Sequence, residues 1–265
     1  MSNWFSIQDK VALVTGGSRG IGEMIAAGFL QHGATVYISS RKSDVCDATA
    51  AKLQEKYGGS CSSIPADLSE LSGIEALVAK LSDCESRLDI LVNNAGSTWG
   101  APIDEFPEIG WDKVMDTNVK GIFFMIQKCL PLLRESASEE DPARVINIGS
   151  VDGIKTPGFD NFSYGPSKAA VHHLTRQMAA HLVRENIVVN AIAPGPFPSW
   201  MLSAGVGFGG QVEGADWESV GRGNPRKRVG TMEDIAGLAI FLSSRAGAYT
   251  VGETITCDGG AVAVS

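Results

Sequence analysis

The sequence predicts an α/β protein: a single Rossmann domain with a doubly wound, seven-stranded parallel sheet and helices on both faces. Short β-branched runs alternate with longer helical patterns along the chain, which is typical of βαβ units. Several short runs are apolar throughout, as in Val11-Ala12-Leu13-Val14, so these strands are expected to be covered on both faces. The 265 residues are 44% hydrophobic, enough for one substantial core. We therefore expect residues 1–265 to form one domain.

Hydrophobic periodicity and breaker residues place the elements along the chain. The expected strands are 10–15, 34–39, 61–65, 88–93, 144–148, 187–192 and 254–257. The expected helices are 20–32, 44–57, 70–82, 111–135, 162–185 and 231–243. Pro166 is tolerated only near a helix start, so it is expected in or next to the first turn of its helix. Thr231 is the expected N-cap of the last helix, with Asp234 three residues on.

The segment 195–230 interrupts this alternation. It is rich in glycine, and its large apolar side chains are Phe197, Trp200, Met201, Phe208 and Trp217. A disordered surface loop is one interpretation, but apolar groups of that size are unusual in a solvated linker. A mobile flap over an apolar substrate explains them better, so we expect a substrate flap at about 195–230.

Composition and charge argue against several classes of protein. The formal net charge is −8, with 30 acidic and 22 basic residues, so a nucleic-acid partner is not expected. No apolar stretch is long enough to span a membrane, and the N-terminus does not resemble a signal peptide, so we expect a cytoplasmic protein without a membrane partner. Five widely spaced cysteines form no Cys-x-x-Cys pair, so neither a disulfide framework nor a metal site is expected.

A glycine-rich turn lies between the first expected strand and the first expected helix. Such a turn brings backbone N–H groups and a helix N-terminus to the pyrophosphate of a dinucleotide. The spacing Gly16-x3-Gly20-x-Gly22 differs from the common Gly-x-Gly-x-x-Gly pattern, and glycine turns also serve packing alone. The strand–turn–helix context favours cofactor binding. The candidate ligands here are Gly16, Ser18, Arg19, Gly20, Ile21 and Gly22.

The end of the second expected strand indicates which cofactor binds. An NAD-selective enzyme usually has an acidic residue here for the ribose hydroxyls, whereas this chain has Ser40 and Arg41. Arg41, with Arg19 nearby in this topology, can hold a 2′-phosphate by charge-assisted hydrogen bonds, and Ser40 can add a hydroxyl donor. The alternative is that both arginines are solvated surface charges. We predict NADP(H).

Ser150, Tyr164 and Lys168 are the expected catalytic residues. Tyr164 and Lys168 are four apart at the start of a helix, so they lie on one helix face. Ser150 ends the fifth expected strand, and ligands of an open α/β sheet bind outside the carboxyl ends of its strands. All three side chains are therefore expected in the cofactor cleft.

These residue types suit carbonyl reduction. A tyrosine has an ordinary pKa of about 10, and a neighbouring ammonium group lowers it by favouring the phenolate. We expect Lys168 to act on Tyr164 in this way. Tyr164 then gives its proton to the developing alkoxide as hydride arrives, while the Ser150 hydroxyl polarises the carbonyl.

Taken together, these residues resemble the most common subtype of the short-chain dehydrogenase/reductase family. The matching runs are 15–22, Asp67-Leu68, Asn93-Asn94-Ala95-Gly96, Asn118, Ser150, Tyr164 with Lys168, and Pro194-Gly195. They span almost the whole chain. The resemblance implies an NADP(H)-dependent oxidoreductase acting on CH-OH groups, assembled as a homotetramer or homodimer. The segment 257–260 resembles the part of the family's C-terminus that packs near a subunit interface.

The resemblance also implies further site residues. Asp67, followed by Leu68, would contact the adenine, and Asn94, Ala95 and Gly96 would line the central part of the cofactor. Asn118 would hold a water that links Lys168 to solvent, and Tyr164 and Lys168 would lie at the nicotinamide ribose. After Pro194 and Gly195 this chain has Phe197 and Ser199 where the family often has a small β-branched residue and a threonine. Phe197 would then shape the pocket, and Ser199 would replace the threonine.

Within the family, three runs resemble the NADPH-dependent β-ketoacyl reductases associated with rhamnolipid biosynthesis: Trp99-Gly100, 142–151 and 197–199. This resemblance implies an apolar ketone, such as a 3-oxoacyl group, as substrate. A hydroxysteroid or other alicyclic alcohol dehydrogenase is an alternative that the apolar flap would serve equally well. A non-catalytic, cofactor-sensing protein is a second alternative, against which the intact Ser150, Tyr164 and Lys168 set argues.

Overall fold

The computed structural model describes residues 3–156 and 158–264. Its centre is one seven-stranded sheet in the order β3-β2-β1-β4-β5-β6-β7, with every neighbouring pair parallel. The strands are β1 (Val11–Thr15), β2 (Thr35–Ser39), β3 (Cys61–Ser63), β4 (Ile90–Asn93), β5 (Ala143–Ile148), β6 (Ile187–Pro194) and β7 (Thr254–Cys257). The predicted doubly wound parallel sheet is confirmed.

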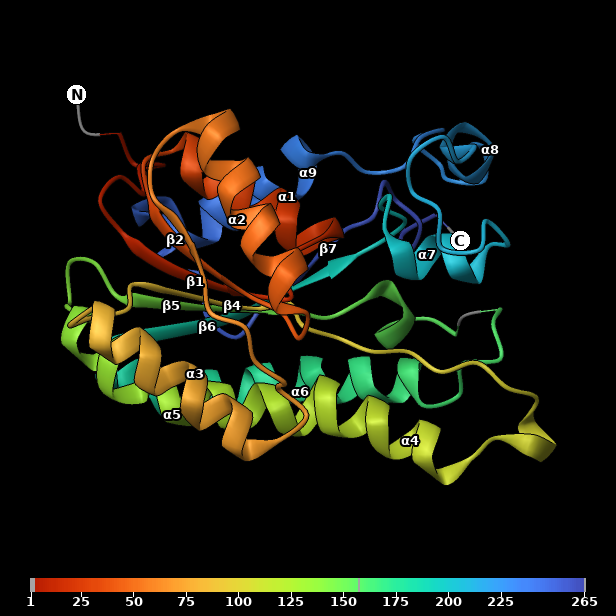
Figure 1. The fold of residues 1–265 in the computed structure, drawn as a ribbon, viewed down its shortest axis with the longest axis horizontal. Coiled ribbons are helices and arrows are strands. Elements are labelled where there is room, and N and C mark those ends of the chain that lie inside the picture. The colour runs from red at the N-terminus through yellow and green to blue at the C-terminus, as the bar shows by residue number, and fades with distance from the viewer. Residues whose placement is uncertain (1–2, 157, 265) are drawn as a thin grey trace.

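Helices cover both faces of this sheet (Figure 1). They are α1 (Gly20–Gln31), α2 (Ser43–Tyr57), α3 (Leu71–Cys84), α4 (Glu108–Met115), α5 (Gly121–Ser136), α6 (Tyr164–Leu182), α7 (Trp200–Gly205), α8 (Trp217–Arg222) and α9 (Met232–Ser243). Alternate residues of each strand point to opposite faces, so Val14 joins the core under α1, α2 and α9. Leu13 joins the core under α3, α5 and α6.

Three features of the helices follow from particular residues. The expected capping box at α9 is present, because the Thr231 side chain and the Asp234 side chain each satisfy the other's backbone N–H. Pro166 is the third residue of α6, in the first turn, where its missing N–H is not needed. Gly28 lets α1 approach α9 closely, since a Cβ there would lie 2.4 Å from the Cβ of Ala236.

The helix predicted at 111–135 is not one regular helix. It begins earlier, as α4, and passes through a π-helical turn at Asp116–Lys120 before it continues as α5. Hydrophobic periodicity cannot reveal such a turn, because one extra residue within the helix leaves the apolar pattern on either side intact. The turn matters because it contains Asn118.

The segment 195–230 contains the short helices α7 and α8, which the sequence analysis did not predict. Ser199 caps α7 by accepting the Leu202 N–H at 3.2 Å, and Asp216 caps α8 by accepting the Ser219 N–H at 2.9 Å. Each helix is only six residues long, too short to show a helical period against so many glycines.

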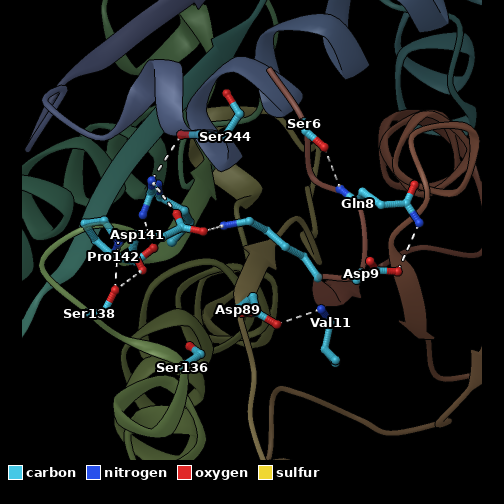
Figure 2. Close-up of polar contacts among 12 residues, drawn as sticks. Ser6, Gln8, Asp9, Val11, Asp89, Ser136, Ser138, Asp141, Pro142 and Ser244 are labelled. Carbon is cyan, nitrogen blue, oxygen red and sulfur yellow. Dashed lines mark hydrogen bonds and ion pairs between the residues drawn. The ribbon is translucent and has the colours of Figure 1, made fainter. Parts of the chain in front are cut away.

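The amino ends of β1 and β5 are tied together by a charge network of the buried Lys10 and Arg144 with the partly exposed Asp141 (Figure 2). The Asp141 carboxylate lies 2.6 Å from the Lys10 Nζ and 3.3 Å from the Arg144 Nη2. The same Nη2 donates to the Ser244 carbonyl at 3.0 Å. Arg144 is buried, and its partners offset the cost of burying the charge. This edge is therefore structural, and the opposite, carboxyl edge is where the polar residues of the predicted site lie.

Within the described ranges, no helix is long and apolar enough to cross a membrane. The cytoplasmic location stays a prediction.

Candidate active site

The glycine turn joins β1 to α1 at the carboxyl edge of the sheet. Gly16 and Gly20 have φ angles of +64° and +57°, in the left-handed region that favours glycine. The Asn94 Nδ2 donates to the Thr15 and Gly16 carbonyls at 3.0 and 3.1 Å and so fixes the turn. A Cβ on Gly22 would lie 2.4 Å from the same Nδ2. The glycines thus allow both a tight turn and close packing against Asn94.

The predicted phosphate-binding residues around this turn differ in exposure. Arg19 and Arg41 are exposed, Ser40 is partly buried and Ser18 is buried. In the part of the chain that the structure describes, neither arginine forms an ion pair with a carboxylate. The Arg19 guanidinium instead stacks on the Trp200 ring at 5.1 Å from its centroid. Two uncompensated cations beside a backbone cradle fit a dinucleotide with a 2′-phosphate.

Two residues predicted at the adenine end differ in how far they are exposed. Asp67 is exposed, and its Oδ1 accepts the Ser69 N–H at 3.0 Å and the Ser69 hydroxyl at 2.7 Å. The Leu68 side chain is buried in the core under α3 and α5. Only Asp67 therefore presents a side chain to the edge where a cofactor would lie.

The segment after β4 brings the predicted central cofactor residues next to the catalytic ones. The Thr15 hydroxyl accepts the Ala95 N–H at 3.1 Å, which ties the segment to β1. A Cβ on Gly96 would lie 3.5 Å from the Asn118 Oδ1 and 3.6 Å from the Lys168 Nζ, in ordinary contact with both. Gly96 therefore lies between the predicted relay residue and the predicted catalytic lysine.

Asn118 is fully buried within the π-helical turn. Its Oδ1 accepts the Ser97 N–H at 2.7 Å, and its Nδ2 donates to the Ser97 carbonyl and the Ser167 hydroxyl, each at 2.9 Å. The Ser167 hydroxyl in turn donates to the Tyr164 carbonyl at 2.7 Å. Asn118 thus links the segment after β4 to the first turn of α6.

Tyr164 and Lys168 lie one turn apart at the start of α6. The Lys168 Nζ donates to the Ile148 carbonyl at 2.8 Å and lies 5.5 Å from the centroid of the Tyr164 ring. Ser150 follows β5 directly, and its Oγ accepts the Asp152 N–H at 3.1 Å. The tertiary structure brings Ser150, Tyr164 and Lys168 to one edge of the sheet, as predicted.

The pKa of Tyr164 is shifted in the direction opposite to the one we expected from Lys168. Burial, and to a smaller extent the negative charge of Asp152, raise it to about 12, with the Ser150 side chain opposing them. Burial also lowers the pKa of Lys168 to about 8, against the opposing effect of Asp152. Desolvation disfavours the charged form of both groups and is the largest cause of each shift. Tyr164 is therefore held as a neutral proton donor.

Two further residues lie beside this centre, Asp152 and His172, and neither was predicted from the sequence. Burial raises the pKa of the Asp152 carboxyl, with Lys155 and Lys168 opposing. His172 is buried on α6, two turns beyond Tyr164, and its Nε2 accepts the Ser150 N–H at 3.4 Å. For His172 the signal was in the sequence, since it lies four residues after Lys168 and eight after Tyr164, at helical spacing.

The predicted residues after β6 lie between the glycine turn and the C-terminal segment. Gly195 packs against Asp258, because a Cβ there would lie 2.8 Å from the Asp258 Cα. Phe197 is only 3% exposed and lines a cavity of about 590 Å³, whose lining also includes the charged Arg228 and Asp258. Ser199 lies beside the turn, with its Cβ 3.3 Å from the position of a Cβ on Gly20. Phe197 thus shapes a cavity wall, while Ser199 serves as a helix cap.

Comparison with known proteins decides the family. The model of the family described as "Enoyl-(Acyl carrier protein) reductase" matches residues 16–262. The chain is 51% identical over 260 residues, 98% of its own length and 99% of the relative's, to the rhamnolipids biosynthesis 3-oxoacyl-[acyl-carrier-protein] reductase of Pseudomonas aeruginosa. The chain belongs to the short-chain dehydrogenase/reductase family. It is an oxidoreductase, as predicted.

Further relatives and solved structures agree with this assignment. Gluconate 5-dehydrogenase of Gluconobacter oxydans is 34% identical, and the alignment covers 97% of this chain and 96% of the relative. The solved Pseudomonas aeruginosa RhlG/NADP active-site complex superposes with a TM-score of 0.90 at 50% identity, covering 98% of this chain and 99% of that one. The predicted resemblance to the β-ketoacyl reductases of rhamnolipid biosynthesis is confirmed.

Proposed function

We propose that this short-chain dehydrogenase/reductase is an NADPH-dependent carbonyl reductase for apolar ketones, with a 3-oxoacyl group as the substrate. The observation that carries the proposal is the convergence of Ser150, Tyr164 and Lys168 on the edge of the sheet that also holds the glycine turn. The first of the relatives above is named for 3-oxoacyl reduction.

The cofactor is NADP(H), which supplies the hydride when bound. The backbone of residues 16–22 and the N-terminus of α1 hold its pyrophosphate. Arg19 and Arg41, with Ser40, hold the 2′-phosphate that distinguishes it from NAD(H). Asp67 would contact the adenine, and the 94–96 and 194–199 segments would line the middle and the nicotinamide end of the cofactor. A relative of this chain was solved with NADP in its active site.

The side chains divide the chemistry between them. The Ser150 hydroxyl donates to the substrate carbonyl oxygen and polarises it, and the neutral Tyr164 hydroxyl transfers its proton to that oxygen as charge develops there. Lys168 stabilises the tyrosinate that remains and binds the nicotinamide ribose. Asn118 connects Lys168 to solvent through a water molecule, so that the proton is replaced.

The 195–230 segment provides the apolar part of the substrate site as a flap. Pro196 and Phe197 follow Gly195 directly, and the Phe208 and Trp217 rings pack edge to face at 5.7 Å. An acyl chain matches such a lining by burial of apolar area.

The enzyme is also proposed to be a homotetramer. Trp111 on α4 and Phe123 on α5 are exposed, and apolar side chains on neighbouring helices are typical of a subunit interface. Light scattering during gel filtration tests this proposal, and a single monomeric peak at micromolar concentration would contradict it.

The test of the function is a substrate panel followed by NADPH absorbance. It contains 3-oxoacyl thioesters of increasing chain length, hydroxysteroids with their ketones, and gluconate. The highest kcat/KM is expected for a 3-oxoacyl thioester, rising with chain length as more apolar area is buried. A preference for a steroid or a sugar acid would reject the proposed substrate while leaving the reaction class intact.

A further inference from the structure

We propose that His172 is a positioning residue for catalysis, which holds Ser150 in place by accepting its backbone N–H. The inference rests on the role proposed for Ser150 above. It concerns a residue that neither touches the substrate nor belongs to the Ser150, Tyr164 and Lys168 set.

The first observation is the alignment of His172 with the catalytic residues along α6. Tyr164, Lys168 and His172 are each four residues apart and therefore lie on one face of the helix. Lys168 and His172 reach the same chain segment at positions two residues apart. Lys168 donates to the Ile148 carbonyl at 2.8 Å, and His172 accepts the Ser150 N–H at 3.4 Å. The helix that presents Tyr164 thus also fixes the end of β5.

The second observation is the direction of this hydrogen bond. A backbone N–H only donates, so the Nε2 of His172 must carry a lone pair, and the ring is the neutral tautomer protonated at Nδ1. Burial, followed by the charges of Lys168 and Arg176, lowers the pKa of His172 to about 4, which keeps the ring neutral. Among the described residues, His172 supplies the hydrogen-bond acceptor for this amide.

The third observation is that the chain around Ser150 is shaped to receive the ring. A Cβ on Gly149 would lie 2.1 Å from the His172 Nε2, and a Cβ on Gly153 would lie 2.8 Å from its Cε1. Neither glycine has a positive φ, so lack of space is what requires them. At Gly149 the nearest atoms are those of the His172 ring, whereas at Gly153 the α6 backbone of Lys168 and Ala169, at 2.7 Å, excludes a Cβ together with the ring. His172 is 5% exposed in the resulting niche. An imidazole, and not merely any buried side chain, fills the space behind Ser150.

The structure also shows why Ser150 needs this support. The neighbouring Gly149 N–H is held by β6, donating to the Ile192 carbonyl at 2.8 Å, but the parallel pairing ends at Ile148. Ser150 therefore lies one residue beyond the last backbone hydrogen bond to the sheet. Its hydroxyl must be placed to within a fraction of an ångström to polarise a carbonyl, and loss of such placement costs up to a hundredfold in rate.

The experiment compares His172→Leu with His172→Gln, because glutamine keeps an acceptor at a reach similar to that of Nε2. In the Leu variant kcat is expected to fall about tenfold or more, while the KM for NADPH changes less than twofold. The Gln variant is expected to keep kcat within about threefold of the parent. Equal kcat losses in both variants, or no loss in the Leu variant, would overturn the inference. If the Leu variant is not recovered folded, His172→Asn, which is too short to reach, replaces it.

Thr175→Val is the matched control. Thr175 is buried one turn further along α6, where its hydroxyl accepts from the Asn147 Nδ2 and donates to the Val171 carbonyl, each at 2.9 Å. Its loss removes a buried polar contact of the same helix without touching Ser150. A kcat within about twofold of the parent, with a lowered Tm, is expected. A tenfold loss of kcat here would mean that any damage to α6 has the effect attributed to His172.

A double-mutant cycle with Ser150→Ala separates this inference from the proposed function. If Ser150→Ala keeps its activity, the role proposed for Ser150 fails. If it loses activity, adding His172→Leu is expected to change kcat by less than about twofold, because the group that His172 positions is already gone. A full additional tenfold loss would show that His172 does not act through Ser150.

Discussion

The Arg19 guanidinium carbon lies 5.1 Å from the centroid of the Trp200 ring. Arg19 belongs to the glycine turn, and Trp200 opens α7 in the 195–230 segment. The contact therefore joins the proposed phosphate end of the cofactor site to the start of the substrate flap. A guanidinium over an exposed indole is stabilised by about 0.5–1 kcal/mol. Arg19 is held in the position from which it is proposed to meet the 2′-phosphate.

Replacing Trp200 by leucine is expected to raise the KM for NADPH by about two- to fivefold, the equivalent of losing this stacking energy. A guanidinium stacks less strongly on phenylalanine than on tryptophan. The KM for NADPH of Trp200→Phe is therefore expected to lie between the values of the parent and of Trp200→Leu. The KM for NADH, which lacks the 2′-phosphate, serves as the internal control and should not change. An equal rise for both cofactors would show that Trp200 supports the turn in general and not Arg19.

Replacing Tyr164 by phenylalanine is expected to lower kcat by about 10²- to 10⁴-fold, because the proton donor is lost. NADPH binding, measured by quenching of tryptophan fluorescence, should stay within a few-fold of the parent, since the ring remains. This result also argues against a cofactor sensor. Full turnover in the variant would contradict the proposed mechanism.

Replacing Arg41 by alanine is expected to lower kcat/KM for NADPH by about 10- to 150-fold, the equivalent of one charge-assisted hydrogen bond of 1.5–3 kcal/mol. The same measurement with NADH should change less than about twofold. Lys42 is the matched control, because it is the next residue, is exposed and carries the same charge. An equal loss in Lys42→Ala would indicate a general effect of surface charge.

Asp234 makes the stability of the enzyme depend on pH. Its carboxylate binds Arg228 at 2.5 and 2.9 Å and accepts the Thr231 N–H at 2.8 Å. Arg228 is the main reason that the pKa of Asp234 falls from 3.8 to about 2. The folded state thus favours the ionised form. This stabilisation is complete above pH 3.8 and is lost as the pH falls toward 2.

Asp234→Ala is accordingly expected to lower the Tm by about 2–4 °C at pH 7, for a cap worth about 1 kcal/mol. The difference between parent and variant should shrink as the pH is lowered from 4 toward 2, which thermal unfolding followed by circular dichroism measures. Glu218→Ala serves as the control, since its ion pair with Arg222 spans 3.9 Å between exposed groups. A difference in Tm that is the same at pH 7 and pH 3 would contradict the role of the charge.

Much of the fold was predictable from the sequence because it depends on local patterns. All seven strands were predicted within one or two residues at most ends, since fully buried strands are continuous apolar runs bounded by turn residues. The π-helical turn around Asn118 and the helices α7 and α8 were not predicted, because neither an inserted residue nor a six-residue helix changes the hydrophobic period.

In the candidate site, too, some features were predictable from local sequence patterns and others were not. Tyr164, Lys168 and the glycine turn could be found from spacing alone, and the order of these patterns along the chain indicated the family. The direction in which the pKa of Tyr164 shifts could not be predicted from the sequence. It depends on how deeply the ring is buried and on Asp152, which lies in a different segment of the chain. His172 was at a predictable spacing, but nothing in the sequence placed it behind Ser150.

The sequence by itself thus determined which residues carry the chemistry, because helical spacing and strand order are set by local interactions. Only the tertiary structure decided how those residues are held. The contacts of Arg19 with Trp200, Asn118 with Ser167, and His172 with Ser150 join residues 22 to 181 positions apart. Such contacts form only when whole elements pack together, and no local pattern encodes the packing distance between them.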